Sequence, residues 1–339
     1  MSIGKPADPP QRLGSIAGLA GLLEKYHVDT KALFSEFEIP ATVEISDTRA
    51  PFPKVAALLE RAAKLAGCPH LGLELGSLSD HRILGPVGDL MSCAPNLEKA
   101  LRDYIRYQMA YSKAAAVYLW RIGDDVGFGY GVYHRTGGGR QIYDLVTALG
   151  CSFLRALTND AVRPVEIHLS IAAPRDVGPY RKLLPAPVVF DQGHTCLVIR
   201  RRDLQAAIPT RQDAERERLK TMLDASLGHD LKDIVARVRH MLRPALLAGR
   251  CGIDAIADEL AIHPRTLSRR LASAGLTFEE LRDEVRLAVA CELLELTNLP
   301  VGAIGDALSY ASHSAFVHAF KRWTGVPPSD WRHDLRSPS

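Results

Sequence analysis

The last ninety residues of the chain carry the same hydrophobic pattern twice. Apolar residues follow one another at steps of 4, 2, 5 and 4 in the first copy, and at steps of 4, 2, 6 and 4 in the second. A step of 4 keeps two side chains on one face of a helix, whereas the step of 2 breaks the helical phase. The two series are Ile256, Leu260, Ile262, Leu267 and Leu271, and Ile304, Leu308, Tyr310, Phe316 and Phe320. Each copy is therefore predicted to form two short helices joined by a sharp turn, which is the layout of a helix-turn-helix.

Small residues and glycines support both turns. Four small residues occupy positions where the two helix backbones are expected to approach closely: Ala257, Ala261, Gly305 and Ser309. Each second helix is followed by a glycine, Gly275 or Gly325, which can adopt the left-handed cap that other residues resist. The sequence thus predicts where each helix pair turns and where it ends.

The segment between the two copies is predicted to be one long helix. Thr277 and Glu280 have the spacing of a capping box, and apolar residues recur at helical intervals as far as Leu296. Such a helix of about 20 residues is ~30 Å long, since each residue adds ~1.5 Å. Successive major-groove faces on one side of B-DNA are ~34 Å apart. One chain is therefore expected to place two recognition helices in the major groove, about 10 base pairs apart.

The same residues resemble a known family. The stretch ALSYASHSAFVHAFKRWTGVPPSDWR closely resembles the signature of AraC/XylS-type transcription regulators, and IADELAIHPRTLSRRLASAGLTFEELRDEVR resembles the preceding half of that domain. The resemblance covers roughly residues 240–336, with Ser309 where the family usually has glycine and Gly305 where it usually has alanine. The N-terminal portion resembles the helix-rich sensing domain of a subset that includes ornithine-utilisation and virulence regulators.

This resemblance implies a sequence-specific regulator of transcription that is responsive to an unknown small-molecule effector. It implies activation more often than repression, contact with RNA polymerase, and a homodimer formed through the N-terminal domain. Residues predicted to read base edges in double-stranded DNA are Arg265, Ser268, Arg269, His313, Ser314 and His318. Residues predicted to contact DNA phosphates are Thr266, Arg270, Ser312, Lys321 and Arg322. Among these, Arg269 is the preferred candidate, because arginine can grip guanine with two hydrogen bonds. Effector-binding residues are not predicted.

The distribution of charged residues along the chain supports the prediction of DNA binding. The chain has a formal net charge of only +3, and residues 250–339 contain 10 basic and 12 acidic residues. However, the two predicted recognition helices carry basic residues and no acidic ones. The acidic residues belong to the supporting helices: Asp254, Asp258, Glu259, Glu279, Glu280, Asp283, Glu284, Glu292 and Glu295. Acid-free recognition helices favour contact with phosphates and base edges, with an affinity that falls as salt rises.

The first two thirds of the chain are predicted to be a mixed α+β domain. Helical patterns are expected at residues 15–26, 30–37, 53–66, 96–112 and 140–157. Strands are expected at residues 115–122, 126–133, 165–171, 188–190 and 195–199, the first two forming a hairpin. The predicted fold class is thus an α+β sensing domain followed by an all-α domain with two helix-turn-helix motifs joined by a long helix.

The predicted domain organisation has four parts. They are a disordered N-terminus (1–12), an effector-sensing and dimerisation domain (13–205), a linker (206–230) and a DNA-binding domain (231–336) with helix-turn-helix motifs at 253–274 and 301–324. The highly charged residues 210–220 indicate a linker or a linker helix. No stretch is apolar enough for a membrane span, and the start lacks the apolar core of an export signal, so a cytoplasmic protein without membrane contact is expected. Six scattered cysteines without a CxxC pair predict reduced thiols, and neither a metal nor a cofactor is predicted.

Two other classes remain open. For an enzyme, the glycine-rich run at residues 127–140 could suggest a phosphate cradle, but it lacks the lysine and serine of a nucleotide-binding loop. His194 and Cys196 could suggest a nucleophile pair, but neighbours within a strand are expected to point apart. The third class is a helical protein-interaction module that shares only the helix-turn-helix geometry.

Overall fold

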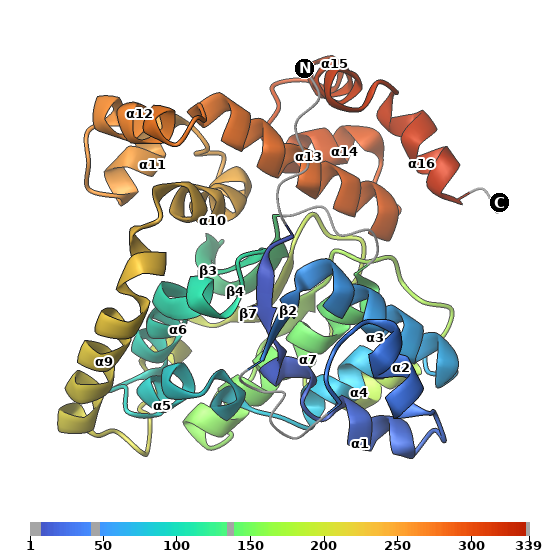
Figure 1. Cartoon of the computed structure of the whole chain (residues 1–339), viewed down its shortest axis with the longest axis vertical. Coiled ribbons are helices and arrows are strands. Elements are labelled where there is room, and N and C mark those ends of the chain that lie inside the picture. Colours follow the sequence, from blue (N-terminus) through green and yellow to red (C-terminus); the bar gives the residue numbers. More distant parts are fainter. Residues whose placement is uncertain (1–7, 42–47, 134–138, 337–339) are drawn as a thin grey trace.

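The computed structural model describes residues 8–41, 48–133 and 139–336. These residues form two hydrophobic cores. The larger core gathers buried side chains between Leu13 and Leu223, and the second gathers those between Val238 and Phe320. The second core also takes in three side chains from the first half of the chain: Ala116, Tyr118 and Tyr133. In Figure 1 the sheet-containing N-terminal body lies below and the helical C-terminal body lies above. The predicted fold class is confirmed.

The N-terminal body consists of helices and a five-stranded sheet. Its helices are α1 (Leu19–Glu24), α2 (Thr30–Glu36), α3 (Phe52–Leu65), α4 (Leu71–Ser77), α5 (Pro86–Ser92), α6 (Leu97–Tyr111), α7 (Arg140–Thr158) and α8 (Gly178–Leu183), with 3-10 turns η1 (Leu13–Ile16), η3 (His81–Leu84) and η4 (Arg201–Gln205). Its sheet strands are β3 (Ala115–Ile122), β4 (Asp125–Val132), β5 (Glu166–His168), β6 (Val188–Val189) and β7 (Thr195–Ile199). The strand order is β3-β4-β7-β5-β6, and all pairs except β5 with β6 are antiparallel.

The alternation of side chains along β4 gives the sheet two different faces. Phe128 points to the N-terminal core, whereas Gly129 lies beneath Tyr118 and Trp120 on the opposite face. Gly127, Gly129 and Gly131 fall within the strand expected at residues 126–133, and the structure places all three in β4. The later part of that glycine-rich run, residues 134–138, lies outside the described residues.

Helix α4 is not among the helices that the sequence pattern predicts. Two of its glycines, Gly72 and Gly76, lie against the backbone of α7, where a Cβ atom would come within 2.3 Å of the Gln141 carbonyl oxygen or 2.4 Å of the Leu145 carbonyl oxygen. The spacing of 4 puts both glycines on one helical face, so the two helices pack at close range. That glycine spacing is the signal from which a helix–helix contact could have been predicted.

Two expectations for chain segments need correction, and a third is decided in favour of one of its alternatives. Residues 10–12, which are expected to be disordered, form strand β1 (Pro10–Arg12) and pair with β2 (Arg49–Pro51). A strand of three residues is too short to show an alternation of apolar and polar residues in the sequence. The helix expected at residues 15–26 is divided between η1 and α1. Residues 206–230, where the sequence allows a linker or a linker helix, contain α9 (Asp213–Lys232), so the helical alternative holds, and α9 packs against α5 and α6. A buried ion pair holds α9 in place, with 2.5 Å between Arg216 of α9 and Asp103 of α6. The many charged residues of this segment do not indicate that one of them is buried.

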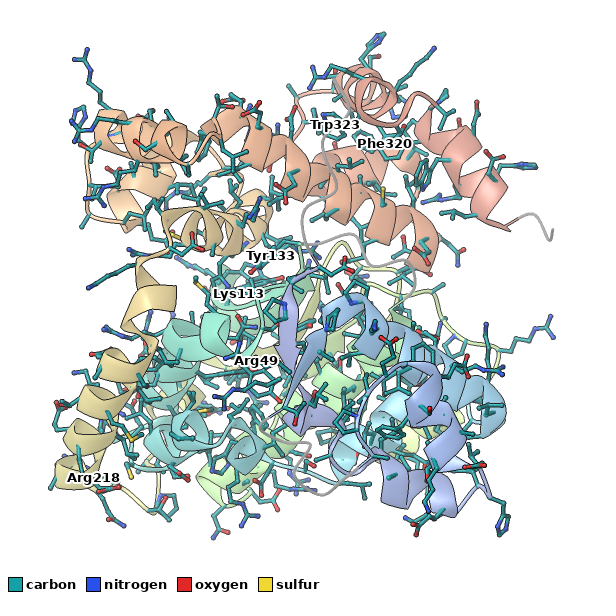
Figure 2. All side chains as sticks on the ribbon, viewed as in Figure 1. Arg49, Lys113, Tyr133, Arg218, Phe320 and Trp323 are labelled. Atoms are coloured by element: carbon teal, nitrogen blue, oxygen red, sulfur yellow. The ribbon has the colours of Figure 1, made fainter. Side chains whose placement is uncertain are left out.

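The C-terminal body is entirely helical. Its helices are α10 (Ile234–Leu247), α11 (Ile253–Glu259), α12 (Pro264–Ser273), α13 (Phe278–Leu296), α14 (Val301–Ala307), α15 (His313–Thr324) and α16 (Pro328–Arg336). Figure 2 shows Tyr133 beneath α10 at the junction of the two bodies, and Phe320 and Trp323 among the helices of the second helix-turn-helix. Within the described part of the chain, no helix has the length and apolar character needed to cross a membrane.

A buried carboxyl group in α7 makes the stability of the N-terminal body depend on pH. Asp144 is fully buried, and one of its oxygens accepts a 2.7 Å hydrogen bond from the hydroxyl of Tyr180 in α8. Its second oxygen has no hydrogen-bond partner among the residues described. Burial raises the pKa of Asp144 to about 7, although the Tyr180 hydrogen bond and the charge of Arg140 act in the opposite direction. The protonated carboxyl group is therefore the form that the fold prefers.

We predict that Asp144→Asn removes a pH-dependent loss of stability. The pKa of Asp144 is about 7 in the folded chain and ~3.9 in the unfolded chain, so the folded chain holds the proton more tightly. This preference stabilises the fold fully at a pH below ~3.9, and the stabilisation is lost as the pH rises to about 7. Urea unfolding measures the free energy of unfolding of both proteins at pH 5 and at pH 8. Between these two pH values the wild-type chain should lose roughly 2–3 kcal/mol more than Asp144→Asn, because each unit of pKa shift corresponds to ~1.4 kcal/mol. Equal pH dependence of the two proteins would contradict the assignment.

Candidate nucleic-acid interface

The first helix-turn-helix comprises α11 and α12. Ile256, Leu267 and Leu271 are buried between the two helices and their neighbours, as the repeated pattern predicts. The ring nitrogen of His263 caps α12 by accepting a hydrogen bond from the amide of Arg265 at 3.2 Å. Because the apolar residues of α12 face inward, its opposite face is presented to solvent.

The second helix-turn-helix comprises α14 and α15. Phe316 and Phe320 are fully buried, and a Cβ atom at Gly305 would lie only 3.2 Å from that of Phe316. The close approach predicted at Gly305 is therefore present. Ser312 caps α15 through its hydroxyl, which accepts a 3.2 Å hydrogen bond from the amide of Ala315.

The two turns share a left-handed residue. Ala261 has φ = 54° and Ser309 has φ = 58°, conformations that favour glycine. The prediction that Ala261 is small because backbones meet there is wrong, since its side chain is exposed and the constraint is its φ angle. Ser309 uses its hydroxyl to donate a 2.7 Å hydrogen bond to the Leu246 carbonyl oxygen. This bond ties the second turn to α10 and gives a physical role to the serine that replaces the family's usual glycine.

Helix α13 joins the two motifs. Its capping box is present, because the Thr277 hydroxyl accepts from the amide of Glu280 while the Glu280 carboxylate accepts from the amide of Thr277. The predicted glycines after α12 and α15 both have positive φ angles, 76° at Gly275 and 85° at Gly325. In Figure 1, α12 and α15 lie along the side of the C-terminal body that points away from the N-terminal body, with α13 between them.

The candidate DNA-contacting side chains on α12 lie on its outer face. Arg265, Ser268, Arg269 and Arg270 are exposed and Thr266 is half-buried. The Ser268 hydroxyl donates a 3.1 Å hydrogen bond to the Pro264 carbonyl oxygen. Among the described residues, no carboxylate pairs with Arg265, Arg269 or Arg270. Three arginine side chains on α12 are thus available to an anionic ligand.

The candidates on α15 are exposed as well, but they differ in their contacts. His313, Ser314, His318 and Lys321 project into solvent. Arg322 donates a 2.7 Å hydrogen bond to Asp283 of α13, and the indole nitrogen of Trp323 donates to the same oxygen at 3.1 Å. Arg322 is therefore held by a carboxylate, which the sequence alone does not indicate because the partners are 39 residues apart.

Several acidic side chains of α13 are engaged away from the recognition helices. Glu284 pairs with Arg239 at 2.9 Å, Glu279 pairs with Arg282, and Glu280 is occupied by the capping box. This arrangement lets a domain that is acidic in sum keep α12 free of negative charge. It gives a structural basis for the charge distribution noted in the sequence.

The recognition helices are positioned by a buried contact between the two bodies. Arg243 of α10 is 1 % exposed and donates hydrogen bonds to Glu292 of α13 at 2.9 Å and to the Val132 carbonyl oxygen of β4 at 3.2 Å. Burial opposes the charge of Arg243, but Glu292 outweighs it and keeps the pKa of the guanidinium above its ordinary value. Gly131 makes room for this side chain, because a Cβ atom there would lie 2.4 Å from Arg243 Nε.

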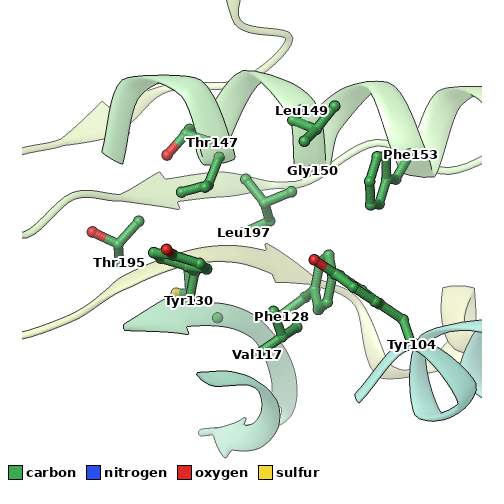
Figure 3. Close-up of a pocket in the computed structure, with 13 residues that line it drawn as sticks. Tyr104, Val117, Phe128, Tyr130, Thr147, Leu149, Gly150, Phe153, Thr195 and Leu197 are labelled. Carbon is green, nitrogen blue, oxygen red and sulfur yellow. The ribbon is translucent and has the colours of Figure 1, made fainter. Parts of the chain in front are cut away.

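The N-terminal body encloses two small cavities on the other face of the sheet. The first, about 50 Å³, lies between α7 and strands β4 and β7, and Figure 3 shows Tyr104, Phe128 and Tyr130 converging on it. The second, about 40 Å³, shares Tyr104 and Tyr130 with the first. Three buried oxygens that line these cavities lack a hydrogen-bond partner in the described part of the chain: those of Gln11, Gln108 and Thr147.

An α+β body with cavities, joined to two helix-turn-helix motifs on one connecting helix, is the architecture of a ligand-binding transcription regulator. Residues 28–208 match the arabinose-binding N-terminal domain of the AraC transcription regulator, and residues 256–334 match a helix-turn-helix domain. The chain belongs to the AraC family, as the sequence resemblance implies. It is a DNA-binding transcriptional regulator with an N-terminal ligand-binding domain.

Relatives with known names are also regulators. The HTH-type transcriptional regulator VirS of Mycobacterium tuberculosis is 29% identical over 329 residues, which cover 95% of this chain and 96% of VirS. The ornithine utilization regulator of Pseudomonas aeruginosa is 26% identical over 321 residues, which cover 93% and 94% of the two chains. The crystal structure of the transcriptional regulator CdpR from Pseudomonas aeruginosa aligns with 93% of this chain and 98% of its own, at 22% identity and a TM-score of 0.45.

We predict that Glu292→Ala weakens the junction between the two bodies. The substitution leaves the buried Arg243 charge without its carboxylate, which should lower the free energy of unfolding by ~3–5 kcal/mol. Glu279→Ala is the matched control, because it removes an exposed ion pair from the same helix and should lower stability by less than ~1 kcal/mol. Urea unfolding measures both, and losses of equal size would show that Arg243 does not depend on Glu292.

Proposed function

We propose that this regulator inserts α12 and α15 into two successive major-groove faces of its operator. In this proposal Arg265, Ser268 and Arg269 read the first face, and His313, Ser314 and His318 read the second. Thr266, Arg270, Ser312, Lys321 and Arg322 contact phosphates. The observation that carries the proposal is the outward, carboxylate-free face of α12, which offers three arginine side chains to base edges and backbone oxygens.

The two helices are proposed to contribute differently. Arg269 on α12 can bind guanine through two hydrogen bonds, whereas the histidines of α15 provide fewer donors. Lys321 contacts phosphate directly, while Asp283 orients Arg322 and partly neutralises its charge. Most of the discrimination between sequences should therefore come from α12, and α15 should add register and affinity.

We further propose that a small-molecule effector binds in the two adjacent cavities of the N-terminal body. The unpartnered oxygens of Gln11, Gln108 and Thr147 favour a ligand with hydrogen-bond donors, and the aromatic walls favour an apolar portion. Typical ligand pockets measure ~300–1,000 Å³, so binding requires the cavities to open and merge. Opening would move β4, whose other face contacts Arg243, and effector and operator affinities would then change each other reciprocally.

The remaining features of the proposed function follow from the family. The chain would act without catalysing a reaction, as a cytoplasmic activator that contacts RNA polymerase and forms a homodimer through its N-terminal domain. Residues 13–205 would form the sensing and dimerisation domain, residues 206–230 the connection, and residues 231–336 the DNA-binding domain.

We predict that replacing Arg265 and Arg269 together by alanine abolishes selective DNA binding. Each bidentate contact to guanine contributes ~1–3 kcal/mol of discrimination, so the double variant should lose at least tenfold in affinity for its operator. The measurement is fluorescence anisotropy on a sequence selected from random DNA, at two salt concentrations.

The matched control replaces Arg181 and Arg202 by alanine, since both are exposed arginines of the N-terminal body. This variant should keep the wild-type affinity, because the same total charge is removed far from α12. If the Arg265→Ala, Arg269→Ala protein stays folded and binds the selected sequence like the wild type, the assignment of α12 as the reading helix fails.

A further inference from the structure

Three side chains with metal-binding atoms meet on the face of the sheet that points toward the C-terminal body. They are His168 of β5, His194 just before β7, and Cys196 of β7, and their ligand atoms all lie within 4.8 Å of one another. His168 and Cys196 are cross-strand partners, so the pleat directs both to one face, and His194 shares that face because it lies two residues from Cys196. The expectation that His194 and Cys196 point apart is therefore wrong.

The two imidazoles are spaced as ligands of one ion would be. The Nδ1 atom of His168 lies 3.1 Å from the Nε2 atom of His194, and without a metal ion the two rings share a hydrogen bond. Two nitrogens that bind one Zn²⁺ at ~2.0–2.1 Å in a tetrahedral arrangement lie ~3.3 Å apart. The pair can therefore accept a metal ion with only a small adjustment of the rings.

A carboxylate supports the first of these ligands. Glu166 places an oxygen 2.6 Å from Nε2 of His168, the nitrogen on the far side of the ring from His194. When Nε2 donates its proton to Glu166, the lone pair of Nδ1 is directed into the cluster. Metal-binding histidines commonly have such a carboxylate behind them, because it fixes the tautomer and increases the basicity of the ligand.

The surroundings also suit a metal ion. Cys196 is buried, and the ring of His194 contacts Trp120 edge-on with centroids 5.0 Å apart. His194 also lines a cleft of about 470 Å³ between the two bodies, bordered by Leu246 at the end of α10 and Ala307 of α14. The cleft thus reaches the cluster at His194.

A second cluster of similar composition is less suited to a metal ion. Cys68, His70 and Glu74 also bring their ligand atoms within 4.8 Å. However, both carboxylate oxygens of Glu74 accept from the hydroxyl of Tyr26 at 2.9 Å, and that hydroxyl also lies 3.5 Å from the Cys68 sulfur. The tyrosine thus occupies the position that an ion would need.

We propose that His168, His194 and Cys196 bind a divalent transition-metal ion of the zinc class, with the fourth position supplied from the cleft. Two imidazole nitrogens and a thiolate are ligands that Zn²⁺ prefers, and three protein ligands leave one position open to water or another donor. The Cys196 thiol loses its proton to solvent when the metal–sulfur bond forms. The cluster and the proposed effector cavities lie largely on opposite faces of the sheet, but they are adjacent, because Cys196 also lines the first cavity.

The test is titration of the metal-free, full-length chain with Co²⁺, which replaces Zn²⁺ and reports on its ligands. The wild-type chain should show a near-ultraviolet sulfur-to-cobalt charge-transfer band and visible bands typical of tetrahedral cobalt, and added Zn²⁺ should remove them. Cys196→Ser should lose the charge-transfer band. Cys151→Ser should retain it, because Cys151 is a buried thiol on α7 outside the cluster.

A positioning variant keeps the test decisive if Cys196→Ser does not fold. Glu166→Gln leaves all three ligands in place and should weaken Co²⁺ binding ~10–100-fold, the usual effect of removing a carboxylate behind a metal-binding histidine. Circular dichroism of the metal-free proteins verifies folding. Absence of the charge-transfer band in the wild type, or an undiminished band in folded Cys196→Ser, would overturn the proposal. DNA binding is not used as a readout, so failure here leaves the proposed function unaffected.

Discussion

The arrangement of the two bodies depends on one buried charge. Arg243 crosses from α10 to the sheet, and the two terminal nitrogens of its guanidinium donate to the Val132 carbonyl oxygen and the Glu292 carboxylate, whereas its Nε has no hydrogen-bond partner among the described residues. Removing such a charge from water is unfavourable unless its partners are in place, so α10, α13 and β4 must meet in one geometry. Gly131 is part of the same constraint, because any side chain there would displace the arginine. Together with the hydrogen bonds from the Ala172 amide to the Leu296 carbonyl oxygen and from the Asn298 amide to Asp191, this contact holds α13, and with it both recognition helices, against the N-terminal body.

Among the described residues, strand β4 therefore lies between the proposed effector cavities and Arg243 of the DNA-binding body. Phe128 and Tyr130 line the first cavity, while Gly129 and Gly131 form the opposite face of the strand. A ligand that separated Tyr130 from α7 would shift the backbone that accepts the Arg243 hydrogen bond. The strand thus offers a short physical route for coupling that needs no long-range network of residues. The histidine and cysteine cluster lies on the same side as these glycines, so a bound metal ion would stiffen β5 and β7 beneath the cleft between the bodies.

The sequence predicts the helices of the C-terminal body well because the patterns that indicate them are local. The repeated apolar steps, the capping box at Thr277 and the glycine after α15 each depend on residues within a few positions of one another. The missed features depend on contacts between distant segments. Arg243 gave no sign that it was buried, Arg322 gave no sign of its partner Asp283, and the ion pair that anchors α9 joins residues more than one hundred positions apart. His168 and Cys196 meet only because an antiparallel pairing of β5 with β7 brings them together, and periodicity along one strand does not specify which strand lies beside it.

We propose that one chain reads two groove faces of DNA with two helices that are held at the two ends of α13. Hydroxyl-radical footprinting of the full-length protein on its selected operator measures this arrangement. Two protected segments per protomer are expected, about 10 base pairs apart, and the double substitution Ser314→Ala, His318→Ala should weaken protection of one segment and leave the other intact. A single short protected segment in the wild type, unchanged by the substitutions in α15, would contradict it.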